Sequence, residues 1–363
     1  MSLGDQNRDE KGELKPLKGA SGFKIGNPVE LKSSLEEVGY LCKDFLAVQI
    51  ALVLSTPSKK TRALLLEGPS GCGKSFMAQS LAKITGAKFY CLSCYTGMDT
   101  QNLIESRSMV GISKAMSGKE VEDTDLVNLG IITRAFQNSQ KQPTILLIDE
   151  LDKADEGIDT FFLGPIQDGA IFVESQDEPI EANIDNLLIV FTKNMNRVLD
   201  QALLRRLHPL RMTYLDSSLE KKILSPFCHE QLVSNLVEIA DRMRNSEGSY
   251  EFERPPAPEE LLSCGLYTTK LLEWGVRDFL FVGKTLWPII AKSERDRAVF
   301  NHMMRHHPDY MDPLVPDSRN ASIEEIQKRF GRLVLDKIVA DPDEPKRQEA
   351  MRALEAEYAG EAA

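Results

Sequence analysis

The sequence predicts an α/β fold, in which a parallel sheet lies between two layers of helices, followed by a helical domain. Short apolar runs recur within residues 63–191, and such runs are typical of strands buried on both faces. Segments with helical periodicity separate these runs, so strands and helices alternate as in βαβ units. After Ser217 the strand-like runs stop and only helical periodicity continues.

The composition is that of a globular chain about two domains long. The chain has 363 residues, 42% hydrophobic and 27% charged, and a domain takes roughly 150 residues. No apolar run reaches the roughly 20 residues of a membrane span, and the polar start at Gly4–Glu13 lacks the order of a signal peptide. Six cysteines without such a leader indicate reduced thiols. We therefore expect a cytoplasmic protein without membrane contact.

The α/β domain is expected over residues 28–215, after a mobile polar tail at residues 1–27. Two helices come first, because Pro28–Glu37 and Tyr40–Leu54 carry apolar residues at helical spacing. Further elements follow in order: a strand at Ala63–Leu66, a helix at Ser75–Ile84, a strand at Phe89–Ser93, a helix at Leu126–Asn138, and strands at Ile145–Ile148 and Leu187–Phe191.

The remaining chain is expected to form a helical domain at residues 216–300 and a helical C-terminal extension at 301–363. Helical periodicity marks four segments, which are Leu219–Asn245, Glu259–Leu272, Gly275–Ile290 and Ser322–Val339.

A phosphate-binding loop is predicted at the end of the first strand. The segment Gly68–Ser75 fits G-x-x-x-x-G-K-[ST] and lies between a predicted strand and a predicted helix, the context that this motif requires. Backbone N–H groups and the helix N-terminus favour phosphate there. Lys74 would reach the β- and γ-phosphates, and Ser75 would ligate Mg²⁺. The expected binding residues are Gly68, Pro69, Ser70, Gly71, Cys72, Gly73, Lys74, Ser75 and Phe76.

Two adjacent carboxylates supply the second half of the predicted site. Asp149 and Glu150 directly follow the buried strand Ile145–Ile148. In phosphate-loop enzymes an Asp at this place holds the Mg²⁺ shell, so we expect Asp149 to bind the metal and the nucleotide. A hydrolase also needs a base near the attacking water, and Glu150 is the candidate.

Four segments beyond the phosphate loop resemble the AAA+ ATPases, and within them the MoxR-type and dynein-related branch. The resemblance covers roughly Leu41–Ile290. It rests on D-E-L-D-K-A at 149–154, V-F-T-K-N at 190–194, A-L-L-R-R-L at 202–207 and W-G-V-R-D-F-L at 274–280.

The resemblance implies a role for one residue or residue pair in three of these segments. Asn194 corresponds to the sensor-1 residue, which hydrogen-bonds the attacking water or the γ-phosphate. Arg205 or Arg206 would be an arginine finger that reaches a neighbouring subunit's nucleotide; Arg206 is slightly preferred because Leu207 follows it. Arg277 corresponds to sensor 2 in the helical lid. The resemblance also implies ATP as the nucleotide and a ring of subunits, which we expect to be a hexamer.

Two insertions favour the MoxR-type branch. The stretch between Ser93 and Leu126 is longer than a plain connection and resembles the family's helix-2 insertion. Residues 169–182 resemble the pre-sensor-1 hairpin, with two alternating segments around a polar turn. The resemblance implies remodelling of a protein client, with a von Willebrand A-domain protein as a partner.

Two other functions stay open. The chain could be a nucleic-acid-stimulated motor of a restriction- or defence-type complex, with Lys114 and Lys119 supplying a local track. The net charge of −11 disfavours this, because nucleic-acid binding depends on Lys and Arg. The third alternative is an assembly switch that binds ATP with almost no turnover, which Glu150 and Asn194 disfavour.

Two further groups of residues invite metal hypotheses. Cys91 and Cys94 form a single C-x-x-C pair, whereas a structural zinc site needs four ligands. His302 and His306 lie one helical turn apart just before Pro308. We expect Cys91 and Cys94 to be core or strand-end thiols, and His302 and His306 to lie on a solvated helix end. Cys72 differs from the residue that the family usually has at this place of the phosphate loop, and we expect it to be a small residue that the loop tolerates.

Overall fold

The structure, a computed structural model, describes residues 22–23, 25, 27–117, 120, 126–194, 197–228, 230–245, 252–273, 286 and 288–299. The chain divides into two compact units, Met1–Thr213 and Tyr214–Ala363. Most of the predicted tail, nearly all of the helix expected at Gly275–Ile290, and the whole extension at 301–363 lie outside the described residues.

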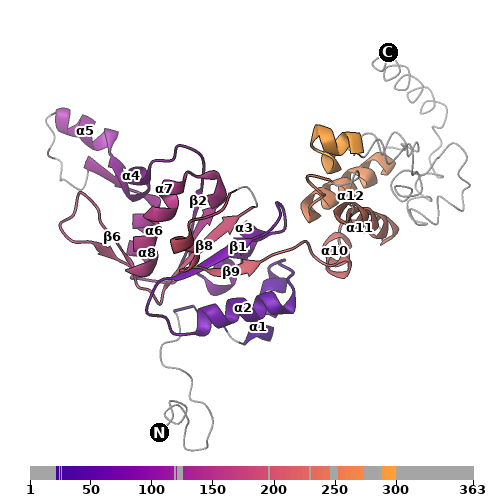
Figure 1. The fold of residues 1–363 in the computed structure, drawn as a ribbon, viewed down its shortest axis with the longest axis horizontal. Helices are drawn as coiled ribbons and strands as arrows, with labels where there is room; N and C mark the ends of the chain where they lie inside the picture. Colours follow the sequence, from indigo (N-terminus) through magenta and orange to yellow (C-terminus); the bar gives the residue numbers. More distant parts are fainter. Residues whose placement is uncertain are drawn as a thin grey trace, which may run out of the picture. The chain divides into compact units, whose positions relative to one another are not determined.

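A five-stranded parallel sheet forms the centre of the first unit (Figure 1). Its strand order is β2-β5-β8-β1-β9, and every neighbouring pair is parallel. The predicted α/β fold is therefore confirmed. The strands are β1 (Arg62–Glu67), β2 (Lys88–Ser93), β5 (Thr144–Asp149), β8 (Leu187–Lys193) and β9 (His208–Arg211).

The connections place helices on both faces of the sheet. Helix α3 (Lys74–Thr85) connects β1 to the distant edge strand β2, and α6 (Ile131–Ser139) leads back from β2 to β5. Because parallel crossovers are right-handed, this change of direction puts α3 and α6 on opposite faces (Figure 1). Helices α1 (Pro28–Glu37) and α2 (Asp44–Ser55) pack together, and α1 contacts α3.

The helix expected at Leu126–Asn138 was wrong in its first part. Residues Val127–Leu129 form strand β4, which pairs antiparallel with β3 (Glu105–Arg107). Gly130 then lies so close to Leu103 that an added Cβ would be 2.1 Å from the Leu103 carbonyl oxygen. A helix running through this glycine would break that contact, so α6 begins only at Ile131.

Two other boundaries differ from the expectation. The helix expected at Leu219–Asn245 is two helices, α10 (Ser217–Leu224) and α11 (Glu230–Arg244). Strand β9 was not expected, because four residues that include Pro209 lack an apolar run. Proline has no N–H to donate, and it is accommodated here because β9 is an edge strand.

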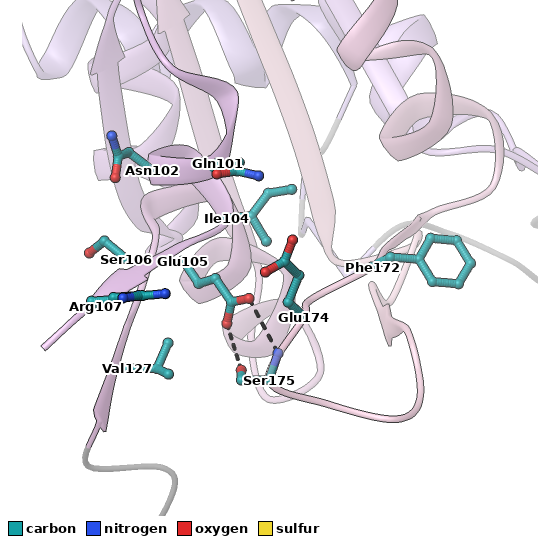
Figure 2. A pocket seen from close by; sticks show the side chains of 10 residues that line it. All are labelled: Gln101, Asn102, Ile104, Glu105, Ser106, Arg107, Val127, Phe172, Glu174 and Ser175. Carbon is teal, nitrogen blue, oxygen red and sulfur yellow. Dashed lines mark hydrogen bonds between the residues drawn. The ribbon is translucent and has the colours of Figure 1, made fainter.

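Two short hairpins lie beside the main sheet. One is formed by β3 and β4, between α4 (Thr100–Ile104) and α6, with α5 (Met109–Met116) in its connection. The other is the expected hairpin in residues 169–182, formed by β6 (Ala170–Ile171) and β7 (Ile180–Glu181). The Glu105 carboxylate accepts hydrogen bonds from the Ser175 hydroxyl at 2.6 Å and from its backbone N–H at 3.2 Å (Figure 2). These bonds link the hairpins across a groove of about 650 Å³.

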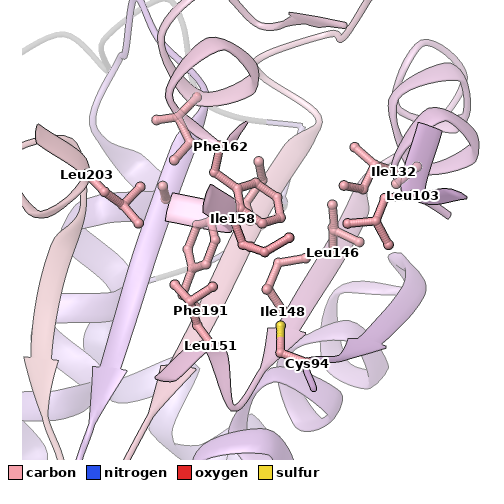
Figure 3. Packing of buried hydrophobic residues seen from close by; sticks show 14 of the residues in the cluster. Cys94, Leu103, Ile132, Leu146, Ile148, Leu151, Ile158, Phe162, Phe191 and Leu203 are labelled. Atoms are coloured by element: carbon pink, nitrogen blue, oxygen red, sulfur yellow. The ribbon is translucent and has the colours of Figure 1, made fainter. Parts of the chain in front are cut away.

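The main core fills the sheet face that α6 covers. Alternate strand residues such as Leu146, Ile148 and Phe191 point into it, as the period of a strand requires. Phe162, which is fully buried, meets Phe191 edge-to-face at 5.0 Å between ring centroids (Figure 3). The intervening residues, such as Leu147 and Val190, are also buried, so both faces of the sheet are covered.

The second unit is helical in its described part. Helices α10, α11 and α12 (Pro258–Glu273) pack around Leu224, Val237 and Leu261. Arg244 forms a buried ion pair with Glu220 at 2.8 Å and lies over the Tyr214 ring. Neither these helices nor any other in the described ranges is both long and apolar enough to cross a membrane.

We predict that Phe162→Ala lowers the free energy of unfolding of the first unit by about 3–5 kcal/mol, since it removes a large buried ring and leaves a cavity. Urea denaturation followed by circular dichroism measures the change. Phe172→Ala is the control, because Phe172 is 80% exposed, and it should shift stability by less than about 0.5 kcal/mol. Equal effects of the two substitutions would contradict the assigned core.

Candidate active site

The predicted site residues meet where three neighbouring strands end. The phosphate loop follows β1, Asp149 ends β5, and Asn194 directly follows β8. Because β5, β8 and β1 are adjacent and parallel, their carboxyl ends lie at one edge of the sheet. Ligands of open α/β sheets bind at this edge.

The phosphate loop has the backbone that its glycines permit. Gly73 has φ 90° and immediately precedes α3, a conformation that residues with a side chain rarely adopt. At Gly68 a Cβ would lie 2.3 Å from the Met212 carbonyl oxygen, so only glycine fits. The first-turn N–H groups of α3 therefore border the loop, where an anion would bind.

Lys74 is folded into the loop. Its Nζ donates hydrogen bonds to the carbonyl oxygens of Gly68 (2.9 Å) and Pro69 (2.7 Å) and to Oδ1 of Asn194 (2.8 Å). Burial lowers the pKa of Lys74, and the negative charges of Asp149 and neighbouring acids oppose this shift. Lys74 thus holds a partly desolvated positive charge whose three hydrogen-bond acceptors are all neutral, and a phosphate would compensate this charge.

Asp149 accepts hydrogen bonds from hydroxyl groups of two other elements, α3 and β8. Its Oδ1 accepts hydrogen bonds from Oγ of Ser75 at 2.6 Å and from Oγ1 of Thr192 at 2.5 Å. Oxygen donors of this kind suit Mg²⁺, which prefers one or two carboxylates together with phosphate and water. The contact between Ser75 and Asp149 shows that both predicted ligands reach one point, so the residues present fit the metal.

Glu150 sits in a turn of unusual backbone conformation. Its φ of 56° is in the left-handed region, and no other non-glycine residue in the described part of the chain has positive φ. The Glu150 carboxylate accepts a hydrogen bond from Nζ of Lys153 at 2.5 Å, and it lies 3.5 Å from Nδ2 of Asn194. Strained residues persist where surrounding contacts fix them, often at active sites, and this turn places Glu150 beside Asn194.

The two candidate finger arginines differ in their surroundings. The Arg206 guanidinium donates to the side-chain oxygen of Gln167 and to the carbonyl oxygen of Ala202. Arg205 is exposed, and within the described residues its guanidinium has no hydrogen bond or ion pair. The charge of Arg205 is therefore available to another molecule, whereas the guanidinium of Arg206, the slightly preferred candidate, is bonded within the chain. Which of the two is a finger stays a prediction.

Three other predicted site residues, Phe76, Cys72 and Arg277, differ in their exposure or lie outside the described part of the chain. Phe76 is 46% exposed and packs on the Tyr40 ring at 5.6 Å between centroids. Cys72 is buried, and this burial raises the pKa of its thiol, which reduces its reactivity. Arg277 lies outside the described residues.

The cysteine pair at the end of β2, with Cys91 in the strand and Cys94 directly after it, has no further metal ligands around it among the described residues. Cys91 is exposed and Cys94 is buried, and burial raises the pKa of the Cys94 thiol to about 12. No group of three or more His, Cys, Asp or Glu side chains that could hold a metal ion occurs among the residues that the structure describes. His302 and His306 lie outside them.

Several residues of the site were missed by the sequence analysis. Thr192 bonds to Asp149, and Asp152 accepts the backbone N–H of Asn194 at 3.2 Å. Arg197 forms two hydrogen bonds of 2.8 Å with the fully buried carboxylate of Asp159. This bond to Asp159 raises the pKa of Arg197. A signal existed only for Thr192, a polar residue at the end of an apolar strand.

We predict that Arg197→Met lowers the free energy of unfolding by about 3–5 kcal/mol, because it leaves Asp159 as an unpaired buried charge. Urea denaturation measures this loss. Adding Asp159→Asn should recover part of it, since the buried charge is then gone. Arg107→Met, at an exposed position, is the control. A loss of stability that the second substitution does not reduce would contradict the ion-pair explanation.

Comparison with known proteins finds a family model and several curated proteins that are similar to the part of the chain that holds this site. Residues 63–207 match the AAA domain of the dynein-related subfamily. The chain is 24% identical over 240 residues to the "Mitochondrial sorting homolog" of Caenorhabditis elegans, covering 63% of this chain and 60% of that protein. It is 26% identical over 192 residues to the "Denitrification regulatory protein NirQ" of Pseudomonas aeruginosa, covering 51% of this chain and 68% of that one.

A "Lon protease" of Finegoldia magna is 30% identical over 190 residues, which cover 50% of this chain but 22% of the protease. The similarity to the Lon protease is thus confined to a part of that protein. The family match includes β1, β5, β8 and the phosphate loop, and an AAA domain implies binding of ATP, typically with Mg²⁺. Residues 63–207 are accordingly similar to an AAA domain of the dynein-related subfamily, and the matched part is less than half of the chain.

Proposed function

We propose that this protein hydrolyses Mg·ATP at the subunit interfaces of a six-membered ring, as its resemblance to AAA+ ATPases implies, and uses the cycle to remodel a protein client. The observation that carries the proposal is the convergence of Lys74, Ser75, Asp149, Glu150 and Asn194 from three adjacent strand ends. A domain that only bound nucleotide would not need a carboxylate held beside an amide at this place.

Each residue has a role that follows from its contacts. Lys74 would exchange its carbonyl partners for the β- and γ-phosphates. Ser75 and Asp149 would hold Mg²⁺, which would neutralise charge on the phosphates when bound. Glu150 would accept a proton from the attacking water, and Asn194, 3.5 Å from Glu150, would orient that water without adding charge.

The ring and the client are inferred from features outside this cluster. Arg205 is exposed and has the charge that an incoming phosphate of another subunit requires. The β3–β4 and β6–β7 hairpins have the positions of the two insertions that favour a MoxR-type protein. A von Willebrand A-domain protein is the partner class proposed on that resemblance, and the lid role of Arg277 is part of the same proposal.

We predict that Lys74→Ala abolishes nucleotide binding, because it removes the cation of the loop. A fluorescent ATP analogue measures the affinity. Lys83→Ala, an exposed lysine at the far end of α3, is the matched control and should bind normally. Retained submicromolar affinity in Lys74→Ala would refute the assigned loop.

Glu150→Gln should retain binding and lower the rate of ATP hydrolysis by about 10²–10⁴-fold, the usual contribution of a general base. Release of phosphate measures the rate. Glu156→Gln, at an exposed position on the next helix, should hydrolyse ATP at the wild-type rate. If wild-type protein has no Glu150-dependent turnover, the ATPase proposal fails and the assembly switch is favoured.

Arg205→Ala is expected to keep nucleotide affinity and to lose about 10³-fold or more in turnover, as expected for a finger, whereas Arg206→Ala should lose far less. Light scattering of Glu150→Gln with Mg·ATP should detect a ring. A monomer or dimer in all conditions, or wild-type turnover in both arginine variants, would count against a site shared between subunits.

A further inference from the structure

We propose that Thr192 is a positioning residue, which orients both acidic side chains of the site through its single hydroxyl group. The inference rests on the proposed function, because it assigns Asp149 to Mg²⁺ and Glu150 to the attacking water. It concerns a residue that lies behind the site and would contact neither nucleotide nor metal.

Thr192 lies where β8 runs beside the end of β5. The register pairs Ile148 with Phe191, so Thr192 is opposite Asp149. Its side chain is fully buried. Oγ1 donates a hydrogen bond to Oδ1 of Asp149 at 2.5 Å and accepts one from the backbone N–H of Glu150 at 2.8 Å. One hydroxyl therefore bonds to two consecutive residues of the neighbouring strand.

The chemistry of the hydroxyl group makes these two bonds complementary. A hydroxyl has one hydrogen to donate and lone pairs that accept. The hydrogen goes to the Asp149 carboxylate, which accepts only, and a lone pair receives the Glu150 N–H, which donates only. Serine could provide the same two bonds, whereas valine, with nearly the same shape, could provide neither.

The Glu150 bond matters because the strand ends there. At φ 56° the Glu150 backbone turns out of β5, so its N–H needs a partner outside the strand ladder. Thr192 supplies this partner and so holds the left-handed turn. This backbone conformation directs the Glu150 carboxylate toward Lys153 and Asn194.

The Asp149 bond has a separate consequence. Oδ1 is shared between Thr192 and Ser75, and Ser75 is the residue proposed to bind Mg²⁺. Thr192 is buried, so its bond fixes the direction of the carboxylate independently of any ligand. Among the described residues, no hydrogen bond to Oδ2 of Asp149 is present, which leaves that oxygen available.

The test compares Thr192→Val with Thr192→Ser in the full chain. We expect Thr192→Val to lower kcat about 10–100-fold and to raise the Mg²⁺ concentration needed for half-maximal activity, as removal of a group that orients a metal ligand generally does. Thr192→Ser should restore both. Thr133→Val is the matched control, because Thr133 is also fully buried and hydrogen-bonded, to the Ile104 carbonyl oxygen, but lies far along the chain from the site residues.

A binding measurement gives a second readout. Without Mg²⁺, Thr192→Val should bind a fluorescent ATP analogue like wild type, and the gain in affinity on adding Mg²⁺ should shrink about tenfold. A uniform loss of affinity with and without Mg²⁺, or a Thr192→Ser variant as impaired as Thr192→Val, would indicate a structural role and overturn the proposal. So would unchanged kcat and Mg²⁺ dependence.

The two proposals fail in different ways. If wild type does not hydrolyse ATP, the ATPase proposal fails, while the Mg²⁺-linked gain in nucleotide affinity still tests Thr192. If Glu150→Gln is inactive and Thr192→Val is fully active, only the role of Thr192 is overturned. Should Thr192→Val not fold, Thr192→Ala is measured in its place, with the same expected losses and the same rescue by serine.

Discussion

The site depends on the alignment of three parallel strands at their carboxyl ends. The β5–β8 register puts Asp149 opposite Thr192, and β1 on the other side of β8 delivers the phosphate loop. A shift by one residue in either pair would turn these side chains to the other face of the sheet. The apolar residues that precede them are buried on both faces, and their close packing fits side chains of particular size and shape at each position, so the hydrophobic core also sets the geometry of the polar residues.

Charge in the site is balanced by contacts that a ligand can replace. Lys74 bonds to two carbonyl oxygens and to Asn194, and Glu150 pairs with Lys153, which is about half exposed. The acceptors around Lys74 can be exchanged for phosphate, and the donor to Glu150 can be exchanged for water, without leaving a buried charge unpaired. The Arg197–Asp159 pair is different, because Asp159 is fully buried, and it belongs to the framework that holds the segment leading to Arg205.

The elements predicted best from the sequence are those with a long apolar pattern or a strict motif. The buried strands around Leu65, Leu147 and Val190 can be recognised in the sequence, because a strand covered on both faces is a continuous apolar run without alternating polar residues. The segment at Val127–Leu129 does not, since three residues carry no period and their strand partner is 20 residues away. Pairing between distant segments is decided by tertiary contacts, here the approach of Gly130 to Leu103.

The same distinction applies within the site. Lys74, Ser75, Asp149 and Glu150 could be predicted because phosphate chemistry requires these residue types at fixed spacing. The different surroundings of Arg205 and Arg206 could not be predicted, since they depend on Gln167, which lies 39 residues away from Arg206 and accepts a hydrogen bond from its guanidinium. The sequence marks Thr192 only as a polar residue at the end of an apolar strand. Its proposed role comes from the register with β5, which places its hydroxyl group against two consecutive acidic residues. Residues that act through others are thus found from neighbouring strands, whereas residues that touch the phosphate are found from the motif.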